Sequence, residues 1–254
     1  MLTKTRFSVA IPAHNEERYV GRCIESILAS RQCWIEGFAI VVAPNRYADL
    51  TPAMAESLGA RRAVEDRKSI AAVRNAAIRG ISPAAVATIG SDSRMAARTV
   101  TEVRRHVYDP RYVGGGSSIR PERWSLGMVF SLLAVAPDVA RRGVSKGMSC
   151  FLREDFEKIG GFDEELVCLA DLDVDLQLQA LGRTRRQKFG TTWGHGIGPS
   201  AERSARSVIG AASKIRRLSV DYFTGQDADA AGHLCYNVDR DESRGNSLAG
   251  YGRF

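Results

Sequence analysis

The chain has 254 residues, and its 44% hydrophobic and 26% charged residues are typical of a globular protein with a sizeable core, in one large domain or two small ones. Its five cysteines include no Cys-x-x-Cys pair, which argues against a disulfide framework and a structural zinc site and favours a reducing cytoplasm. The net charge of +7 includes arginine clusters that attract anions, but no aromatic RNP-like run or zinc finger accompanies them, so we expect no nucleic-acid partner.

In the first half of the chain, short apolar runs alternate with amphipathic segments. We expect strands over residues 7–11, 38–42, 60–64 and 86–89. We expect helices after Asn15, which can act as an N-cap, over 51–58, and from a Ser69 cap to Ile81. Strands that alternate with helices indicate a parallel sheet and the α/β class.

The second half alternates less regularly. Residues 112–119 contain three consecutive glycines and predict a strand with a bulge, and 149–152 predict a short strand. The stretch 171–182 fits both periodicities, but its Gln and Leu content and Gly182 as a stop favour a helix. Past about Gly225 the chain is polar and Gly-rich, so we expect one domain over residues 1–224 and a loosely held tail over 225–254.

The most apolar segment is SLGMVFSLLAVA, residues 125–136. It is shorter than the roughly 20 residues of a membrane span, and MLTKTRFSVAIPAHNEE does not read as a signal peptide because Pro12 interrupts its apolar stretch. A buried helix is the main interpretation of 125–136. Its arginine flanks leave a peripheral contact at the inner membrane face as the alternative.

Three polar clusters lie next to apolar elements. The first is Ile11–Glu17, where a strand–loop–helix turn exposes backbone N–H groups and a positive dipole end to a ligand. The second is Arg74-Asn75 with Asp92, which follows the strand 86–89. The third cluster consists of Asp163, Asp171, Asp173 and Asp175. Asp171 and Asp175 share one helix face and are expected to be solvated, whereas Asp173 is expected to point toward the site.

These pieces together resemble the family 2 glycosyltransferases of the GT-A fold. The resemblance runs through FSVAIPAHNEERYVGRCIESIL, SIAAVRNAAIRGI, VATIGSDSRM, FLREDFEKIGGFDEEL, DVDLQLQALG and GHGIGPS, in the family's order, over roughly residues 6–200. The sequence has no Gly-x-Gly-x-x-Gly turn between a strand and a helix and no Walker loop, so no motif points to a dinucleotide-binding or P-loop protein instead. It implies a single GT-A-like domain with a mainly parallel central sheet flanked by helices.

The resemblance also implies a role for each matching residue. The nucleotide of a nucleotide-sugar donor would be held by Pro12, Ala13, His14, Asn15 and Glu16, with Arg74 and Asp92 nearby. Asp92 and His195 would bind a divalent metal, Mn²⁺ or Mg²⁺, and Asp173 would be the general base. His14 itself is a spacer in the binding loop rather than a base.

The chain departs from the family's pattern at three acidic positions. Gly90 stands where the first Asp of Asp-x-Asp belongs, Ala43 replaces the Asp that reads the base, and Leu172 replaces the acidic residue before the general base. The expected function is metal-assisted transfer of a sugar from a nucleotide-diphosphate donor to an acceptor hydroxyl, with inversion at the anomeric carbon. The alternative is a non-catalytic protein of the same fold that binds a nucleotide-sugar or phosphate, and a sugar nucleotidyltransferase is a third option.

Overall fold

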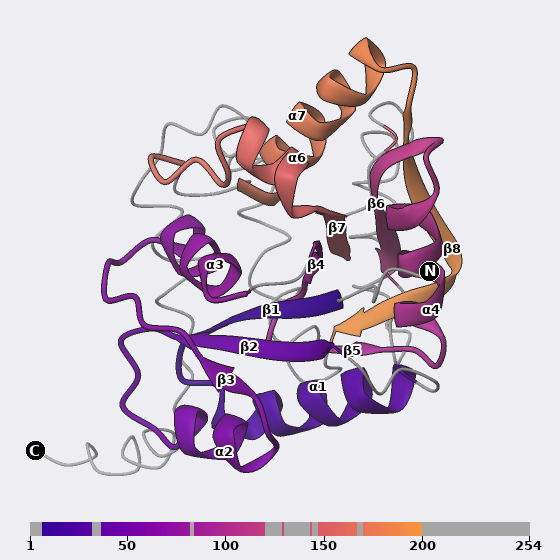
Figure 1. Ribbon diagram of the computed structural model, residues 1–254. Coiled ribbons are helices and arrows are strands. Elements are labelled where there is room, and N and C mark those ends of the chain that lie inside the picture. The colour runs from indigo at the N-terminus through magenta and orange to yellow at the C-terminus, as the bar shows by residue number, and fades with distance from the viewer. Residues whose placement is uncertain are drawn as a thin grey trace, which may run out of the picture.

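The computed structural model describes residues 7–31, 37–81, 84–119, 129, 143, 147–166 and 170–199. They form an eight-stranded sheet with helices on both faces (Figure 1). The strands are β1 (Phe7–Ala13), β2 (Phe38–Pro44), β3 (Arg61–Arg62), β4 (Ala85–Thr88), β5 (Ser93–Met95), β6 (Tyr112–Ile119), β7 (Met148–Leu152) and β8 (Lys188–Pro199). The helices are α1 (Glu17–Ser30), α2 (Thr51–Ser57), α3 (Ile70–Arg79), α4 (Thr99–Tyr108), α6 (Arg153–Lys158) and α7 (Ala170–Thr184). The predicted α/β class is confirmed.

The strand order is β3-β2-β1-β4-β7-β6-β8-β5. Neighbours are parallel at β1–β2, β1–β4, β2–β3 and β6–β8, and antiparallel at β4–β7, β6–β7 and β5–β8. These directions place the carboxyl ends of β1, β2, β4, β6 and β8 at one edge of the sheet, together with the amino ends of β5 and β7. In open α/β sheets this edge is the usual place for a ligand.

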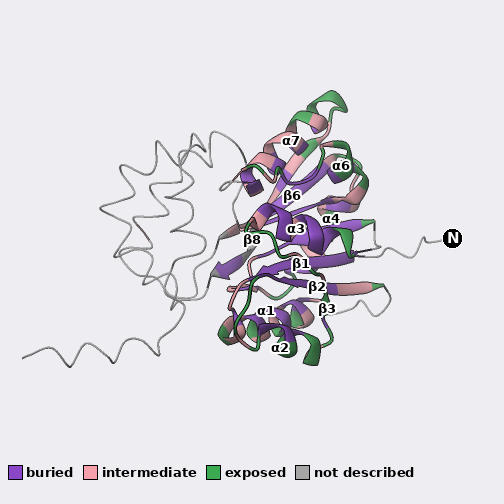
Figure 2. Cartoon of the chain, turned by 90° about the vertical axis from the view of Figure 1, so that its left-hand side faces the viewer, coloured by how far each residue is buried: buried purple, intermediate pink, exposed green. Residues whose placement is uncertain are grey.

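Successive strand residues point to opposite faces of the sheet and pack into two hydrophobic cores, one on each face. Val9 and Ile11 of β1 pack with α1 and α4, whereas Ala10 of β1 packs with α3, α6 and α7. Figure 2 shows buried strands between helices whose outer surfaces are exposed. With both faces covered, β1, β2 and β4 need near-continuous apolar sequences, and this is the signal that made them predictable.

The predicted helix over 171–182 is confirmed as α7, and the predicted strand over 112–119 as β6, with register shifts beside β8. A Cβ on Gly115 would lie 2.5 Å from the carbonyl oxygen of Gly190, so the close approach of β6 and β8 requires a glycine there. The predicted strand over 60–64 shortens to the two residues of β3. The segments 125–136, apart from Val129, and 225–254 lie outside the described residues.

Candidate functional site

The loop after β1 carries the predicted binding segment Pro12–Glu16. Asn15 has a φ of +51°, a left-handed conformation that Asn tolerates better than most residues. Its side-chain oxygen accepts a hydrogen bond from the backbone N–H of Ala48 at 2.7 Å. The prediction that Asn15 caps α1 is therefore wrong, since the helix begins at Glu17 with Glu16 at its N-cap position. Asn15 instead joins this loop to the loop after β2.

Further hydrogen bonds hold the loops after β1, β2 and β3 together. The ring Nδ1 of His14 donates to the carbonyl oxygen of Asn45 at 2.7 Å, which fits the interpretation of His14 as a spacer. The backbone N–H of Glu16 donates to the Thr51 hydroxyl at 2.8 Å. The amide of Asn45 in turn donates to the carbonyl oxygen of Glu65 at 2.6 Å. The three loops therefore form one fixed rim at the carboxyl edge of the sheet.

Asp92 lies at the same edge, in the turn that follows β4. The Ser93 N–H donates to the Gly90 carbonyl at 3.1 Å and closes this turn, and the Asp92 side chain is half-buried. The thiol of Cys23 donates to the same carbonyl, at 3.6 Å. Burial, followed by the Asp92 and Glu16 carboxylates, raises the pKa of this thiol. Both carboxylates therefore act on one buried group, which joins the first predicted cluster to Asp92.

Asp173 lies near the start of α7, whose first turn is tied to α3. Its Oδ2 accepts a hydrogen bond from Nε2 of Gln177 at 2.6 Å, between residues one helical turn apart. Asp171 forms an ion pair with Arg74, and the Arg74 guanidinium lies over the Phe162 ring, 5.5 Å from its centroid. The predicted general base is therefore half-buried, with a hydrogen-bonded carboxylate on an anchored helix.

Asp175 is only 2% exposed, so the prediction that it is solvated is wrong. Desolvation raises the pKa of its carboxyl group well above the ordinary value, although a hydrogen bond with Ser149 and the nearby Arg74 act in the opposite direction. Its Oδ1 has no hydrogen-bond partner among the described residues. Ser149 on β7 is paired with Thr88, the last residue of β4. The contact therefore docks the first turns of α7 beside the end of β4.

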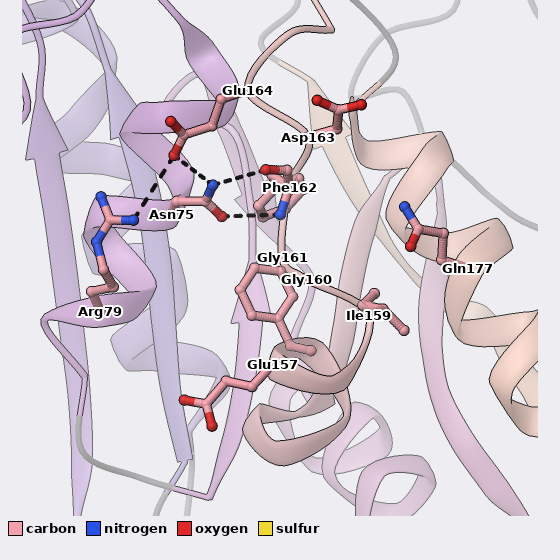
Figure 3. Close-up of a pocket in the computed structure, with 11 residues that line it drawn as sticks. Asn75, Arg79, Glu157, Ile159, Gly160, Gly161, Phe162, Asp163, Glu164 and Gln177 are labelled. Atoms are coloured by element: carbon pink, nitrogen blue, oxygen red, sulfur yellow. Dashed lines mark hydrogen bonds and ion pairs between the residues drawn. The ribbon is translucent and has the colours of Figure 1, made fainter.

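Asn75 fixes the loop between α6 and α7 (Figure 3). Its amide nitrogen donates to the carbonyl oxygen of Phe162 and to the Glu164 carboxylate, both at 2.8 Å, and its Oδ1 accepts from the Phe162 N–H at 3.0 Å. Gly160 and Gly161 precede this contact with φ of +87° and +82°, which L side chains rarely adopt. The two glycines turn the chain so that one amide can satisfy both backbone groups of a buried residue.

The structure sorts the three polar clusters differently from the sequence. Arg74 and Asn75 were grouped with Asp92, but they contact Asp171 and the Phe162–Glu164 loop of the third cluster. Sequence reasoning missed the structural role of Asn75 and the contact of Gln177. The contact between Gln177 and Asp173 could have been predicted, because the two residues are four apart on a predicted helix.

His195 lies in β8, within a Gly-rich stretch of the strand. The side chain of His195 is not among those that the structure describes. Farther along β8, Ile197 is paired with Met95 and Pro199 with Ser93, the residue that follows Asp92. The end of β8 therefore runs beside the turn that carries Asp92.

The described residues contain no group of three His, Cys, Asp or Glu side chains placed to hold a metal ion. Among them, no helix combines the length and apolar character that crossing a bilayer requires.

Residues 8–130, slightly under half of the chain, match the family model described as "Glycosyl transferase family 2". Among curated proteins, none matches the chain by sequence. The match covers β1 to β6 and so includes the loops after β1 and β2 and the turn of Asp92.

Three solved structures share the fold of this chain. A mannosyltransferase from Pyrobaculum calidifontis, in complex with GDP-Man and Mn²⁺, has 19% identity and a TM-score of 0.59, and the alignment covers 74% of this chain and 55% of that one. TarS from S. aureus has 13% identity and a TM-score of 0.58, with coverage of 97% and 46%. Glucosyl-3-phosphoglycerate synthase from Mycobacterium tuberculosis has 18% identity and a TM-score of 0.51, with coverage of 74% and 68%. The chain spans about half the length of the first two proteins, and the similarity establishes the GT-A architecture.

Proposed function

We propose, on the premise that residues 8–130 match glycosyl transferase family 2, that this chain transfers a sugar from a nucleotide-diphosphate donor to an acceptor hydroxyl. The observation that carries the proposal is that the turn of Asp92 and the start of α7, which carries Asp173, lie at the same edge of the sheet. Asp92 follows β4 at that edge, and α7 brings Asp173 to it, because Asp175 contacts Ser149 opposite the last residue of β4.

The nucleotide would occupy the rim built by the loops after β1 and β2. Pro12–Glu16 supply backbone groups there, and the bonds from His14, Asn15 and Glu16 to the second loop fix their positions before any ligand binds. A fixed rim loses little conformational entropy on binding. Solved proteins of this fold carry GDP-Man, UDP-GlcNAc or UDP, which supports a nucleotide-sugar as the donor class.

The donor atoms at this edge fit a divalent metal with an open coordination sphere. Asp92 offers a hard carboxylate, and His195 on the adjacent β8 is proposed as a second ligand. Mg²⁺ and Mn²⁺ commonly bind through one or two protein groups together with phosphate oxygens and water, so a cluster of three protein ligands is not needed. When bound, the metal would supply positive charge against the departing diphosphate.

Asp173 is proposed to accept the proton of the acceptor hydroxyl. The acceptor oxygen forms a bond to the anomeric carbon as the bond from that carbon to the diphosphate oxygen breaks, and the nucleoside diphosphate leaves with the electron pair. Attack from the face opposite the leaving group inverts the anomeric centre. The hydrogen bond from Gln177 orients the carboxylate before the acceptor arrives.

The test is a turnover assay of the purified chain with Mn²⁺ and a panel of UDP- and GDP-linked sugars, which measures nucleoside diphosphate release with and without acceptors. We expect Asp173→Asn to retain donor binding and lose about 10²–10⁴-fold in kcat, the usual contribution of a general base. Asp109→Asn is the matched control, since this half-buried carboxylate lies before the amino end of β6, at the opposite edge of the sheet. Unchanged turnover in Asp173→Asn would remove Asp173 from the reaction.

The same panel tests the second candidate function, a non-catalytic nucleotide-sugar-binding protein. The three missing acidic positions favour it, because Ala43 and Leu172 are buried apolar residues and Gly90 has no side chain. Donor binding by calorimetry without turnover of any donor would support this alternative and contradict the transferase.

A further inference from the structure

A cavity of about 660 Å³ lies between the end of α3, the loop before α7 and the middle of α7 (Figure 3). Its walls are built by Asn75 and Arg79 of α3, by residues 156–157 and 159–164, and by Gln177. Gln177 is also the residue whose amide donates to Asp173 at 2.6 Å. One wall of the cavity is therefore in direct contact with the proposed general base.

The lining combines aromatic rings with both kinds of hydrogen-bonding group. Phe156 and Phe162 meet edge to face, with ring centroids 5.4 Å apart. Carboxylates on the wall accept hydrogen bonds, and the amide of Gln177 has both a donor and an acceptor group. A sugar presents apolar C–H faces and hydroxyls that both donate and accept, so its chemistry matches this lining.

The charges of the cavity are unbalanced. Its wall carries three carboxylates, Glu157, Asp163 and Glu164, against the single guanidinium of Arg79. Arg79 lies 3.6 Å from Glu65 and 3.9 Å from Glu164, and is thus already engaged by carboxylates.

Two of these carboxylates form ion pairs with arginines that lie outside the cavity wall. Arg67 pairs with Glu164 and Arg153 with Glu157, whereas Asp163 accepts a hydrogen bond from the backbone N–H of Glu165. The excess negative charge is therefore concentrated at Asp163. An anionic group in the cavity would meet repulsion, and an amino group would meet attraction.

We infer that this cavity is the acceptor subsite of the proposed transferase, and that it takes an uncharged or amino-bearing carbohydrate rather than a phosphorylated one. The inference rests on the proposed function. The acceptor would occupy the cavity, while its attacking hydroxyl reaches Asp173 past Gln177. Transfer then proceeds by the bond exchange given above.

Binding is measured first without turnover, by saturation-transfer NMR with a methyl hexoside, a methyl 2-amino-2-deoxyhexoside and a hexose 6-phosphate. We expect saturation transfer to the first two probes and little to the phosphate. Ile159→Trp, which fills the cavity from its wall, should abolish these signals while nucleotide binding is retained. Signals that persist in Ile159→Trp would overturn the subsite, whether or not the chain turns over a donor.

Steady-state kinetics then test whether the charge of the cavity selects the acceptor. Asp163→Lys should raise kcat/KM for the hexose phosphate and lower it for the amino sugar, each by about tenfold. Glu56→Lys is the matched control, because it makes the same charge change at an exposed site on α2. Asp163 is exposed on a loop, so this variant keeps the test open if Ile159→Trp does not fold.

The outcomes separate the two proposals. Glycoside binding that Ile159→Trp abolishes, without turnover of any donor, would support a carbohydrate site and contradict the transferase. Normal transfer with acceptor constants unchanged in both cavity variants would contradict the subsite and leave the transferase standing. A wild-type preference for the phosphorylated acceptor would overturn the inference from charge.

Discussion

Replacing Asn75 by alanine removes the side chain that fixes the Phe162–Glu164 loop against α3. The amide makes three hydrogen bonds, two of them with the backbone N–H and C=O of Phe162. Phe162 is 2% exposed, so water does not readily replace the lost partner. Because a buried polar group left unpaired costs about 1–3 kcal/mol, the two backbone groups together predict a loss of about 2–6 kcal/mol in the free energy of unfolding.

Urea unfolding followed by circular dichroism measures this loss. Arg79→Ala is the matched control on the same helix, since its ion pairs at 3.6 and 3.9 Å join exposed or half-buried groups and should contribute no more than about 1 kcal/mol. Asn75→Asp gives a second comparison, because it keeps an acceptor for the Phe162 N–H but places a carboxylate beside Glu164. If Asn75→Ala is no less stable than Arg79→Ala, the loop is held by its packing and the hydrogen-bond reasoning is refuted.

Three further predictions concern other carboxylates. Gly90→Asp should tighten Mn²⁺-dependent nucleotide binding by about 0.5–1.5 kcal/mol in calorimetry, with Gly90→Ala as control, and Asp92→Ala should abolish the metal dependence. A Cβ at Gly90 would lie 2.9 Å from Oδ1 of Asp92, and this end of the side chain can move away, so Gly90→Ala should cost little binding. A larger loss of binding in Gly90→Ala than in Asp92→Ala would contradict this expectation. Asp175→Asn should stabilise the fold increasingly as pH rises above the ordinary pKa of 3.8. Burial raises the pKa of Asp175 in the folded state, so ionisation of this carboxyl group costs stability in the wild type. A gain in stability that is independent of pH would show that ionisation is not the cause. Glu65→Gln should act in the opposite direction, because hydrogen bonds from Arg67 lower the pKa of Glu65 to about 2. The pair then stabilises the fold above pH 4.5, and thermal unfolding should show a loss of no more than about 1 kcal/mol that vanishes as pH falls through 2.

The predicted helix starts show how far local sequence signals reach. Ser69 was predicted to cap α3, and its hydroxyl does accept a hydrogen bond from the Ala72 N–H at 3.3 Å, because the cap and its partner are three residues apart. Asn15 carries the same kind of signal but contacts the backbone of Ala48, 33 residues away. Capping propensity cannot decide between a near and a distant partner once another loop has packed beside the residue.

By itself, the sequence determined the alternation of strands and helices and the position of Asp92 after a buried strand. Both follow from residue periodicity and turn chemistry over a few residues. The tertiary structure alone decided that the Gly-rich segment 188–199 forms β8, since its hydrogen-bonding partners come from β5 and β6. It likewise decided that Asp171 pairs with Arg74 while Asp175, one turn later on the same face, is buried against β7. Exposure and pairing depend on what packs against a residue from elsewhere in the chain, and no local pattern of residues contains that information.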